Sequence, residues 1–281
     1  MRLRATTDDD LPALYTLFLA SIADVYRPHG FPPPAPGFDV FAAQQRHILR
    51  QDPTLCRVAE EAGEPVGFAS AWVRDGDWFL ASLFVASAVQ ARGSGAALLA
   101  AVWGDGLERR RTITDAIQPI SNGLYARRGL IPVTPILAFS GTPSADAELE
   151  QAVPDAAELA RIDGVAYGFD RRVDHVYWAS IARRTGWKRA GEIVAYSYVF
   201  PGGAIGPVAG VDSEAASGAL AGELAAATGS VVVRIPGAAR GLVGTALSAG
   251  LRLGPTPGLL LLSAAAEPAP AVLAISSYTL F

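Results

Sequence analysis

The residues with the clearest chemical potential lie in the turn from Gln90 to Gly95, which reads Gln-Ala-Arg-Gly-Ser-Gly. It follows a strand-like apolar run and precedes a helix-like run, so its main-chain N–H groups would lie at the positive end of a helix dipole. Gly93 and Gly95 let the main chain approach a ligand closely and adopt φ values that a Cβ would forbid. Arg92 adds positive charge. The pattern is typical of a phosphate-binding loop, and a glycine-rich turn without a ligand is the alternative, because short matches are common by chance.

Two other phosphate-binding patterns fit this turn less well. A P-loop requires G-x-x-x-x-G-K-[ST], which the chain lacks, and its one lysine, Lys188, lies elsewhere. A dinucleotide fingerprint requires a third Gly or Ala, but Leu98 follows the two alanines. The strand also ends near Val85, well before Gly93. Asp115 does lie at a distance suited to a ribose-binding acid, so a nicotinamide-dinucleotide-binding protein is the second interpretation.

Hydrophobic periodicity and turn signals predict the elements that would position this turn in the first half of the chain. Thr7 is the expected N-cap of the first helix, and Gly129 is expected to end the last. Predicted helices span residues 6–27, 39–50, 121–130 and a stretch from Ala96, and predicted strands span 55–61, 65–74, 77–85, 111–117 and 131–141.

The second half repeats this order after a linker-like stretch, Gly141 to Glu148. Its predicted helices span 153–166, 171–186, 213–227 and 239–251, and its predicted strands span 192–200, 203–211, 230–236, 258–265 and 274–281. Two halves of matching order indicate an internal duplication with domains 1–142 and 143–281. One irregular α/β domain is the alternative.

The first half resembles the Gcn5-related N-acetyltransferase (GNAT) superfamily. Gln90–Gly95 matches that family's acyl-CoA loop, Q/R-x-x-G-x-G/A, and Tyr125–Leu130 is similar to its Y-x-x-x-G-F segment. The family's usual Asn seven residues before the Tyr is Gln118 here, and its Ala four before the Tyr is Ser121. The resemblance implies an α/β (α+β) fold of two GNAT-like domains, each a mixed, mostly antiparallel sheet flanked by helices.

The resemblance also implies a cosubstrate and a set of site residues. Acetyl-CoA would bind with its phosphates on the loop and its pantetheine arm along the fourth strand. The implied cofactor-binding residues are Leu83, Phe84, Val85, Gln90, Ala91, Arg92, Gly93, Ser94, Gly95, Ala96, Gln118 and Ser121. A primary amine would attack the thioester directly, with Tyr125 as the general acid; a phenol with a pKa of about 10 is protonated at neutral pH.

The general base is not identified by the sequence. Some family members carry a Glu on the fourth strand, where this chain offers Ser82; Asp115, Asp77 and a water relay are the other candidates. This gap, with the Gln118 departure, favours an alternative function, a catalytically idle acyl-CoA binder or sensor. Phe31 and Pro32–Pro34 fall where the family builds its acceptor wall, or form a plain surface loop.

The second half is predicted to be a degenerate copy. Aligning the strands places Asp212–Ala221, which has neither Gln nor Arg, opposite the glycine turn. Ala246, four residues before Gly250, stands in place of Tyr125. We therefore expect this half to lack the loop and the acid and to pack against the first half, although acceptor binding by this half is the alternative.

Bulk composition limits the possible partners. Twenty-three basic and 27 acidic residues give a net charge of −4, which provides no basic surface for nucleic acid. The start is acidic where a signal peptide would be apolar, and no run is long enough to span a membrane, so a cytoplasmic bacterial protein is expected. One cysteine and three scattered histidines predict no metal site. The expected partner is a small-molecule amine, and the expected assembly is a monomer with paired pseudo-dimeric domains or a homodimer.

Overall fold

A computed structural model describes residues 1–90, 92–266 and 270–281. The chain forms two compact units. The first contains Met1–Thr112, Ile117–Leu130 and Ser263–Ala266; the second contains Ile113–Ala116, Ile131–Leu262 and the described residues after 266. The units are interleaved in sequence, because Ile113–Ala116 belongs to the second unit and Ser263–Ala266 to the first. Ile131–Gly141, predicted to close the first domain, also belongs to the second unit.

The first unit is built on a sheet whose strands follow one another in space in the order β1-β2-β3-β4-β5. Each pair from β1 to β4 is antiparallel, and β5 is parallel to β4. The bounds are β1 Arg2–Ala5, β2 Cys56–Glu61, β3 Glu64–Arg74, β4 Asp77–Val85 and β5 Arg109–Asp115. β4 has the predicted bounds, and β1 was not predicted.

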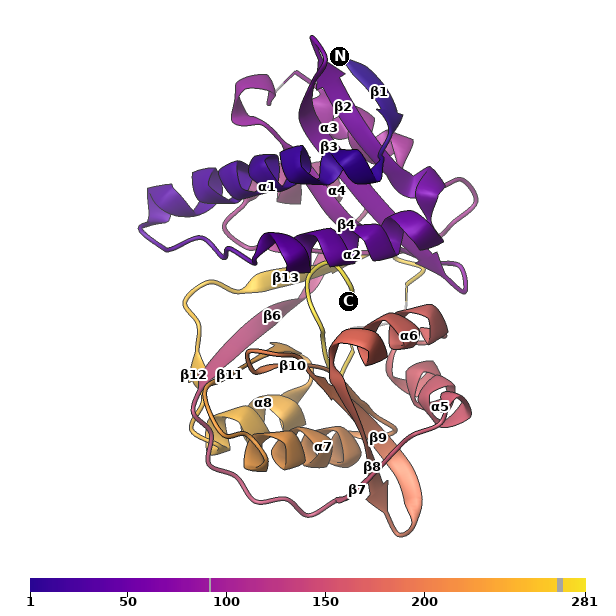
Figure 1. Cartoon of the computed structure of the whole chain (residues 1–281), viewed down its shortest axis with the longest axis vertical. Coiled ribbons are helices and arrows are strands. Elements are labelled where there is room, and N and C mark those ends of the chain that lie inside the picture. Colours follow the sequence, from indigo (N-terminus) through magenta and orange to yellow (C-terminus); the bar gives the residue numbers. More distant parts are fainter. Residues whose placement is uncertain (91, 267–269) are drawn as a thin grey trace. The chain divides into compact units, whose positions relative to one another are not determined.

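Helices cover both faces of this sheet (Figure 1). On one face α1 (Leu11–Tyr26) and α2 (Phe38–Gln51) bury Leu14, Leu17 and Phe41 against Val58 and Phe68. On the other face lies α3 (Ser94–Ala101), where a Cβ on Gly67 would meet the Leu98 side chain at 3.0 Å. Neighbouring residues of a strand point to opposite faces, so Phe68 and Gly67 mark the two sides of β3.

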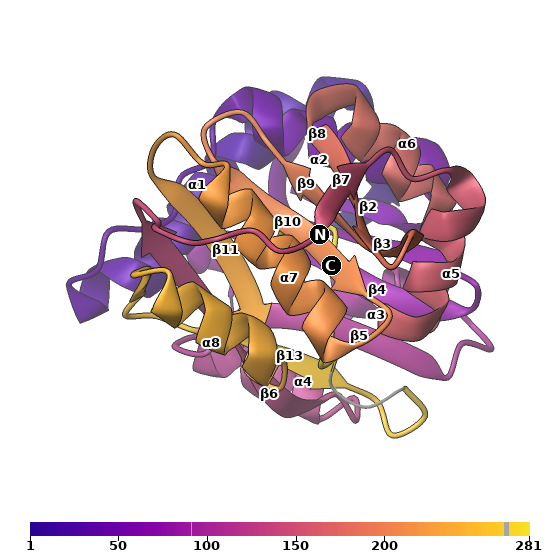
Figure 2. The ribbon, with the colours of Figure 1, turned by 90° about the horizontal axis from the view of Figure 1, so that it is seen from below.

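The second unit has the strand order β13-β6-β11-β10-β9-β8-β7, with β12 paired to β6 and β14 paired to β10. Its strands are β6 Ile131–Gly141, β7 Glu150–Ala152, β8 Arg183–Arg189, β9 Glu192–Val199, β10 Ala204–Gly210, β11 Val231–Pro236, β12 Arg252–Leu253, β13 Gly258–Leu262 and β14 Leu273–Ala274. Its helices are α5 Ala156–Ala166, α6 Arg172–Ile181, α7 Ser213–Ala225 and α8 Arg240–Ser248. Figure 2 shows α7 and α8 beside β10 and β11.

The predicted α/β class with mostly antiparallel sheets flanked by helices is confirmed, but two predicted elements are wrong. The helix predicted over 171–186 ends at Ile181, and Arg183 starts β8. This segment forms a strand because it pairs with β9 and buries Trp187 against α7. The contact with α7 is close: a Cβ on Gly222 would lie 2.3 Å from the Trp187 ring. The closing strand predicted over 274–281 is limited to Leu273–Ala274.

Candidate functional site

The strands β4 and β5 are paired over only part of their length. Parallel pairing joins Asp77–Leu80 to Arg109–Thr112, and the Thr112 hydroxyl donates to the Leu80 carbonyl at 3.0 Å. Immediately beyond, the register with β3 shifts, so Ala81 is the extra residue of a β-bulge. Among described residues β4 pairs only with β3 and β5, so the edge of Leu83–Val85 away from β3 has no strand partner.

The glycine turn places an accessible helix N-terminus at the end of β4. A short 3-10 turn, Ser87–Val89, leads to Gly93, which is the N-cap of α3 and has a φ of +86°. Arg92, Gly93 and Ala96 are exposed. The first N–H groups of a helix have no intrahelical acceptor, and here Ala97 is the residue whose N–H bonds back to Gly93, at 3.0 Å. The N–H groups of the first turn of α3, up to Ala96, therefore have no acceptor within the helix, which is the geometry that the predicted cradle requires; Ala91 lies outside the described residues.

The two glycines of the cradle have different roles. A Cβ on Gly93 would have open space, but its positive φ is strained for any other residue. A Cβ on Gly95 would lie 3.7 Å from the Leu124 side chain, an ordinary contact distance. The Gln90 side chain donates to the Val85 carbonyl at 2.9 Å, so it braces the loop against β4. Conformation thus requires glycine at 93 and not at 95.

Tyr125 lies on α4 (Pro119–Ala126), the helix whose Leu124 faces Gly95 of α3. Its side chain is 4 % exposed. Burial raises the pKa of Tyr125 above its ordinary value, while a hydrogen bond with Ser121 lowers it in part. Gly129, with φ of +78°, ends the helix as predicted, and the Leu130 N–H donates to the Tyr125 carbonyl at 3.1 Å. The phenol is therefore held in its protonated form at neutral pH.

Gln118 serves as the N-cap of α4. Its side-chain oxygen accepts from the Ile120 N–H at 3.2 Å, and its carbonyl accepts from the Asn122 side chain at 2.8 Å. The structure thus uses Gln118 to start the helix that carries Ser121 and Tyr125, and its role toward a cofactor remains a prediction.

The candidate base Asp77 is engaged elsewhere, which corrects one of the predicted alternatives. Its carboxylate contacts Arg111 Nε at 2.6 Å and Arg109 Nε at 2.8 Å and is almost completely buried. A carboxylate held by two guanidinium groups and shielded from solvent is a structural ion pair, already engaged and out of reach of a substrate amine. Asp115, the second candidate, belongs to the second unit, where its charge adds to the burial that raises the pKa of Tyr278 to about 12.

A buried hydrogen-bond chain not predicted from the sequence surrounds Ser82. The Gln45 amide donates to Ser82 Oγ at 3.0 Å, and the Ser70 hydroxyl donates to Gln45 Oε1 at 3.0 Å. These three side chains, on α2, β3 and β4, are all buried. They lie on the α1–α2 face, opposite the phosphate cradle, because Phe84, two residues along β4, packs there on Phe18 and Phe68.

In the second unit, the helix N-terminus that corresponds to the cradle is already capped. Asp212 Oδ1 accepts from the Ala215 N–H at 2.7 Å, and its Oδ2 contacts Arg189 at 2.6 Å. The Arg189 contact, and then the Ala215 N–H, lower the pKa of Asp212. β10 ends at Gly210 and α7 begins at Ser213, so only two residues connect them and there is no longer loop like the one after β4. A carboxylate of the chain occupies the position of the predicted anion.

The helix that corresponds to α4 keeps the same C-terminal geometry without the tyrosine. In α8, Gly250 has a φ of +83° and the Leu251 N–H donates to the Ala246 carbonyl at 3.1 Å. These are the bonds made by Gly129, Leu130 and Tyr125 in the first unit. The correspondence of Ala246 with Tyr125 is confirmed, and the second unit has no phenol at this position.

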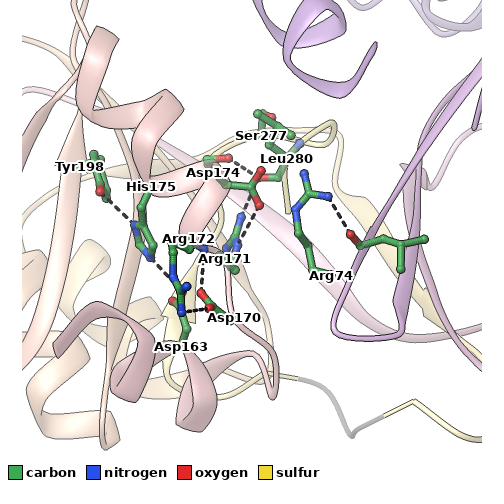
Figure 3. Close-up of polar contacts among 12 residues, drawn as sticks. Arg74, Asp163, Asp170, Arg171, Arg172, Asp174, His175, Tyr198, Ser277 and Leu280 are labelled. Atoms are coloured by element: carbon green, nitrogen blue, oxygen red, sulfur yellow. Dashed lines mark hydrogen bonds and ion pairs between the residues drawn. The ribbon is translucent and has the colours of Figure 1, made fainter. Parts of the chain in front are cut away.

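The second unit also contains a buried polar network that the sequence analysis missed (Figure 3). His175 bonds to Asp163 at 2.8 Å through Nε2 and to the Tyr198 hydroxyl at 2.9 Å through Nδ1. The Tyr196 hydroxyl donates to the other oxygen of Asp163 at 2.5 Å. The interacting polar groups come from α5, α6 and β9, and none of these residues is more than 5 % exposed. The signal available in the sequence was the spacing of Tyr196 and Tyr198, because alternate residues of β9 point to the same face and both tyrosines therefore face these helices.

Comparison with known proteins gives a family match in the first half of the chain. The acetyltransferase (GNAT) family model matches residues 18–130. A search of curated proteins by sequence gave no match. Of the described residues, none forms a helix long and apolar enough to cross a membrane.

Solved structures with the same fold span the whole chain. A Pyrococcus horikoshii protein classed as an acetyltransferase is 19 % identical, with a TM-score of 0.79 over 100 % of this chain and 95 % of that one. A GCN5-related N-acetyltransferase from Sphaerobacter thermophilus is 17 % identical, with a TM-score of 0.63 over 96 % and 97 % of the two chains. A tandem GNAT protein from the clavulanic acid biosynthesis pathway is 15 % identical, with a TM-score of 0.59 over 93 % and 98 %.

Proposed function

We propose that the first unit, where residues 18–130 match the acetyltransferase (GNAT) family model within a chain of tandem GNAT fold, transfers an acetyl group from acetyl-CoA to a primary amine. One observation carries this proposal. The accessible N-terminus of α3 directly follows a strand whose outer edge, Leu83–Val85, has no strand partner among described residues. Such an arrangement offers N–H donors to a diphosphate and main-chain groups to an extended amide-containing arm.

The binding roles follow from the main chain more than from side chains. The N–H groups of Gly93–Ala96 would hold the two phosphates of acetyl-CoA, with Arg92 adding positive charge from the exposed side of the loop. Leu83, Phe84 and Val85 would pair with the amides of the pantetheine arm through their outer edge, apart from the Val85 carbonyl, which already accepts from Gln90. Gln90 would keep the loop in place through its bond to Val85.

The proposed reaction needs no nucleophilic side chain. The amine nitrogen attacks the thioester carbonyl carbon, the new C–N bond forms, and the C–S bond breaks. Tyr125 donates its phenolic proton to the departing sulfur, and the amine's surplus proton leaves to water. Because burial raises the pKa of Tyr125, the phenol carries a proton at neutral pH that it can donate, and after the transfer the phenolate regains a proton from water.

Ligand-induced thermal stabilisation and turnover test this proposal together. A ligand that binds only the folded state raises its melting temperature, so acetyl-CoA is expected to stabilise the chain whereas NAD and ATP do not. Steady release of CoA with at least one amine of a panel, slowed roughly 100-fold in Tyr125→Phe, supports the enzyme. Stabilisation by acetyl-CoA without turnover on any amine would instead support an acyl-CoA sensor, and stabilisation by NAD alone would support a dinucleotide-binding protein.

A further inference from the structure

The second unit has its own pair of parting strands. Parallel pairing between β10 and β11 is limited to Ala204 with Val232 and Ile205 with Val233. Immediately beyond, the register of β10 with β9 shifts between Ile205 and Val208, which indicates a β-bulge. The same sequence of features, short parallel pairing and then a bulge, occurs where β4 leaves β5 in the first unit.

A segment of the chain itself lies between β10 and β11. β14 pairs antiparallel with β10, Ala274 opposite Val208 and Leu273 opposite Ala209, and the Gly210 N–H donates to the Val272 carbonyl at 3.1 Å. On its other edge the Ile275 N–H donates to the Arg234 carbonyl of β11 at 2.9 Å. One short stretch of main chain therefore forms hydrogen bonds with both strands where they separate.

The fit is tight enough to exclude another occupant. Leu273, Ala274 and Ile275 are completely buried. Gly206, at the bulge of β10, has no room for a side chain, because a Cβ there would lie 2.3 Å from the Ile275 carbonyl oxygen. The main chain of the segment thus approaches the bulge as closely as a glycine allows.

We propose that the groove between β10 and β11 is a binding site for extended polypeptide main chain, permanently occupied by Val272–Ile275, and that it is closed to acyl-CoA for this reason. The comparison with acyl-CoA rests on the function proposed for the first unit, whose corresponding edge, Leu83–Val85, would hold the cosubstrate arm. The groove supplies hydrogen bonds to peptide groups on both edges, a requirement that a single amide-containing arm meets only in part.

The phosphate end of the same groove is closed by charge. Asp212 is bonded to the N-terminus of α7, where the corresponding helix of the first unit leaves its N–H groups free. A second anion placed there would face this carboxylate at close range without the helix donors that Asp212 already uses. The second unit thus resembles a cofactor-bound GNAT fold in which segments of the chain replace both parts of the cofactor.

Hydrogen exchange of the intact chain without ligand tests the occupant directly. The amides of Leu273–Ile275 are expected to exchange as slowly as those of Ala195–Ser197 in β9, within roughly tenfold, because both would open only on unfolding of the unit. Exchange of Leu273–Ile275 at rates typical of an exposed segment would overturn the proposal, whatever the first unit binds.

Calorimetric titration with acetyl-CoA tests whether the groove of the second unit is closed to acyl-CoA. One molecule per chain is expected for the wild type, with an affinity roughly 100-fold or more lower for Gly93→Asp. Two molecules per chain in the wild type would overturn the proposal. No binding to the wild type would instead remove the function proposed for the first unit, while hydrogen exchange would still decide whether the groove is filled.

A proline pair provides an independent readout by thermal unfolding. Ala274→Pro places an imide inside the buried strand, whereas the matched Ala271→Pro places it at an exposed residue just before the strand. Ala274→Pro is expected to melt at least several degrees earlier than Ala271→Pro. Equal melting temperatures for the two variants would show that the segment does not need its strand pairing, and would contradict the proposal.

Discussion

The two units share a fold but differ in the residue that caps one corresponding helix N-terminus. In the first, Gly93 leads into α3 with a φ of +86°, and the first N–H groups of the helix have no acceptor within it. In the second, Asp212 caps α7 with its own carboxylate, which is also paired with Arg189. The two N-termini thus differ in their capping residue, a glycine in the first unit and an aspartate that occupies a helix donor in the second.

The strand pairs differ in the same way. β4 and β10 each carry a bulge just after a short parallel pairing, but only β10 has a strand, β14, along its far edge among the described residues. The carbonyls of Tyr125 and Ala246 accept equivalent hydrogen bonds near the C-terminal ends of their helices, yet only Tyr125 carries a phenol. Fold alone therefore does not distinguish the two units, whereas two local substitutions and one additional strand do.

The largest effect is expected from a variant that removes the buried polar network of the second unit. Asp163→Ala leaves His175 and Tyr196 without their buried partner, so we expect a loss of about 3–5 kcal/mol in the free energy of unfolding. Urea denaturation measures it. The matched control is Glu192→Ala, an exposed carboxylate at the start of β9, which should change stability by no more than about 0.5 kcal/mol. Equal effects of the two variants would contradict a structural role for the network.

A carboxylate introduced at Gly93 should make the first unit resemble the second. Gly93→Asp combines a strained positive φ with a negative charge at the helix N-terminus, which together weaken acetyl-CoA binding by roughly 100-fold or more. Calorimetry measures the dissociation constant. Gly95→Ala, whose added methyl group meets Leu124 at an ordinary distance, should stay within about threefold of wild type, since it adds neither strain nor charge. Retention of wild-type affinity by Gly93→Asp would show that the N-terminus of α3 does not bind the cosubstrate.

Tyr125→Phe should remove the proton donor and leave the cofactor site intact. We expect kcat to fall by roughly 100-fold with the KM for acetyl-CoA nearly unchanged. A general acid must be protonated, so activity falls as pH rises through its pKa; because burial raises the pKa of Tyr125, that fall lies above about pH 10 and disappears in the variant. A pH–rate profile of both proteins checks this, and an unchanged kcat would assign protonation to another group.

The smallest expected effect concerns the cap of α7. Asp212→Ala should cost about 1 kcal/mol at neutral pH, since Asp212 is partly exposed and its ion pair with Arg189 is screened by solvent. The pKa of Asp212 is lowered in the folded state, so its contribution is present above the ordinary carboxyl pKa of about 3.9 and is lost as pH falls through the lower folded value. The difference in urea midpoint between the variant and wild type should therefore be larger at pH 7 than at pH 3. A constant difference would show that the charge is not involved.

Local signals account for what the sequence could predict. β4 has its predicted bounds because the Asp75-Gly76 turn limits it on one side, and Gly129 ends α4 because its φ of +78° suits glycine. β8 and β14 could not be predicted from local pattern, since both depend on partners distant in sequence: β9 and α7 for β8, and β10 for β14. The network of His175 was missed for the same reason, because its partners lie on α5 and β9. Asp77 gave no sign in the sequence that Arg109 and Arg111 would enclose it.

Amide chemical-shift changes on titration with acetyl-CoA test the central comparison most directly. The N–H groups of Gly93–Ala96 are expected to shift strongly as they bind the phosphates, while those of Ser213–Ala216, at the capped N-terminus of α7, keep their positions. Shifts at Ser213–Ala216, or none at Gly93–Ala96, would contradict the assignment of the cosubstrate to the first unit.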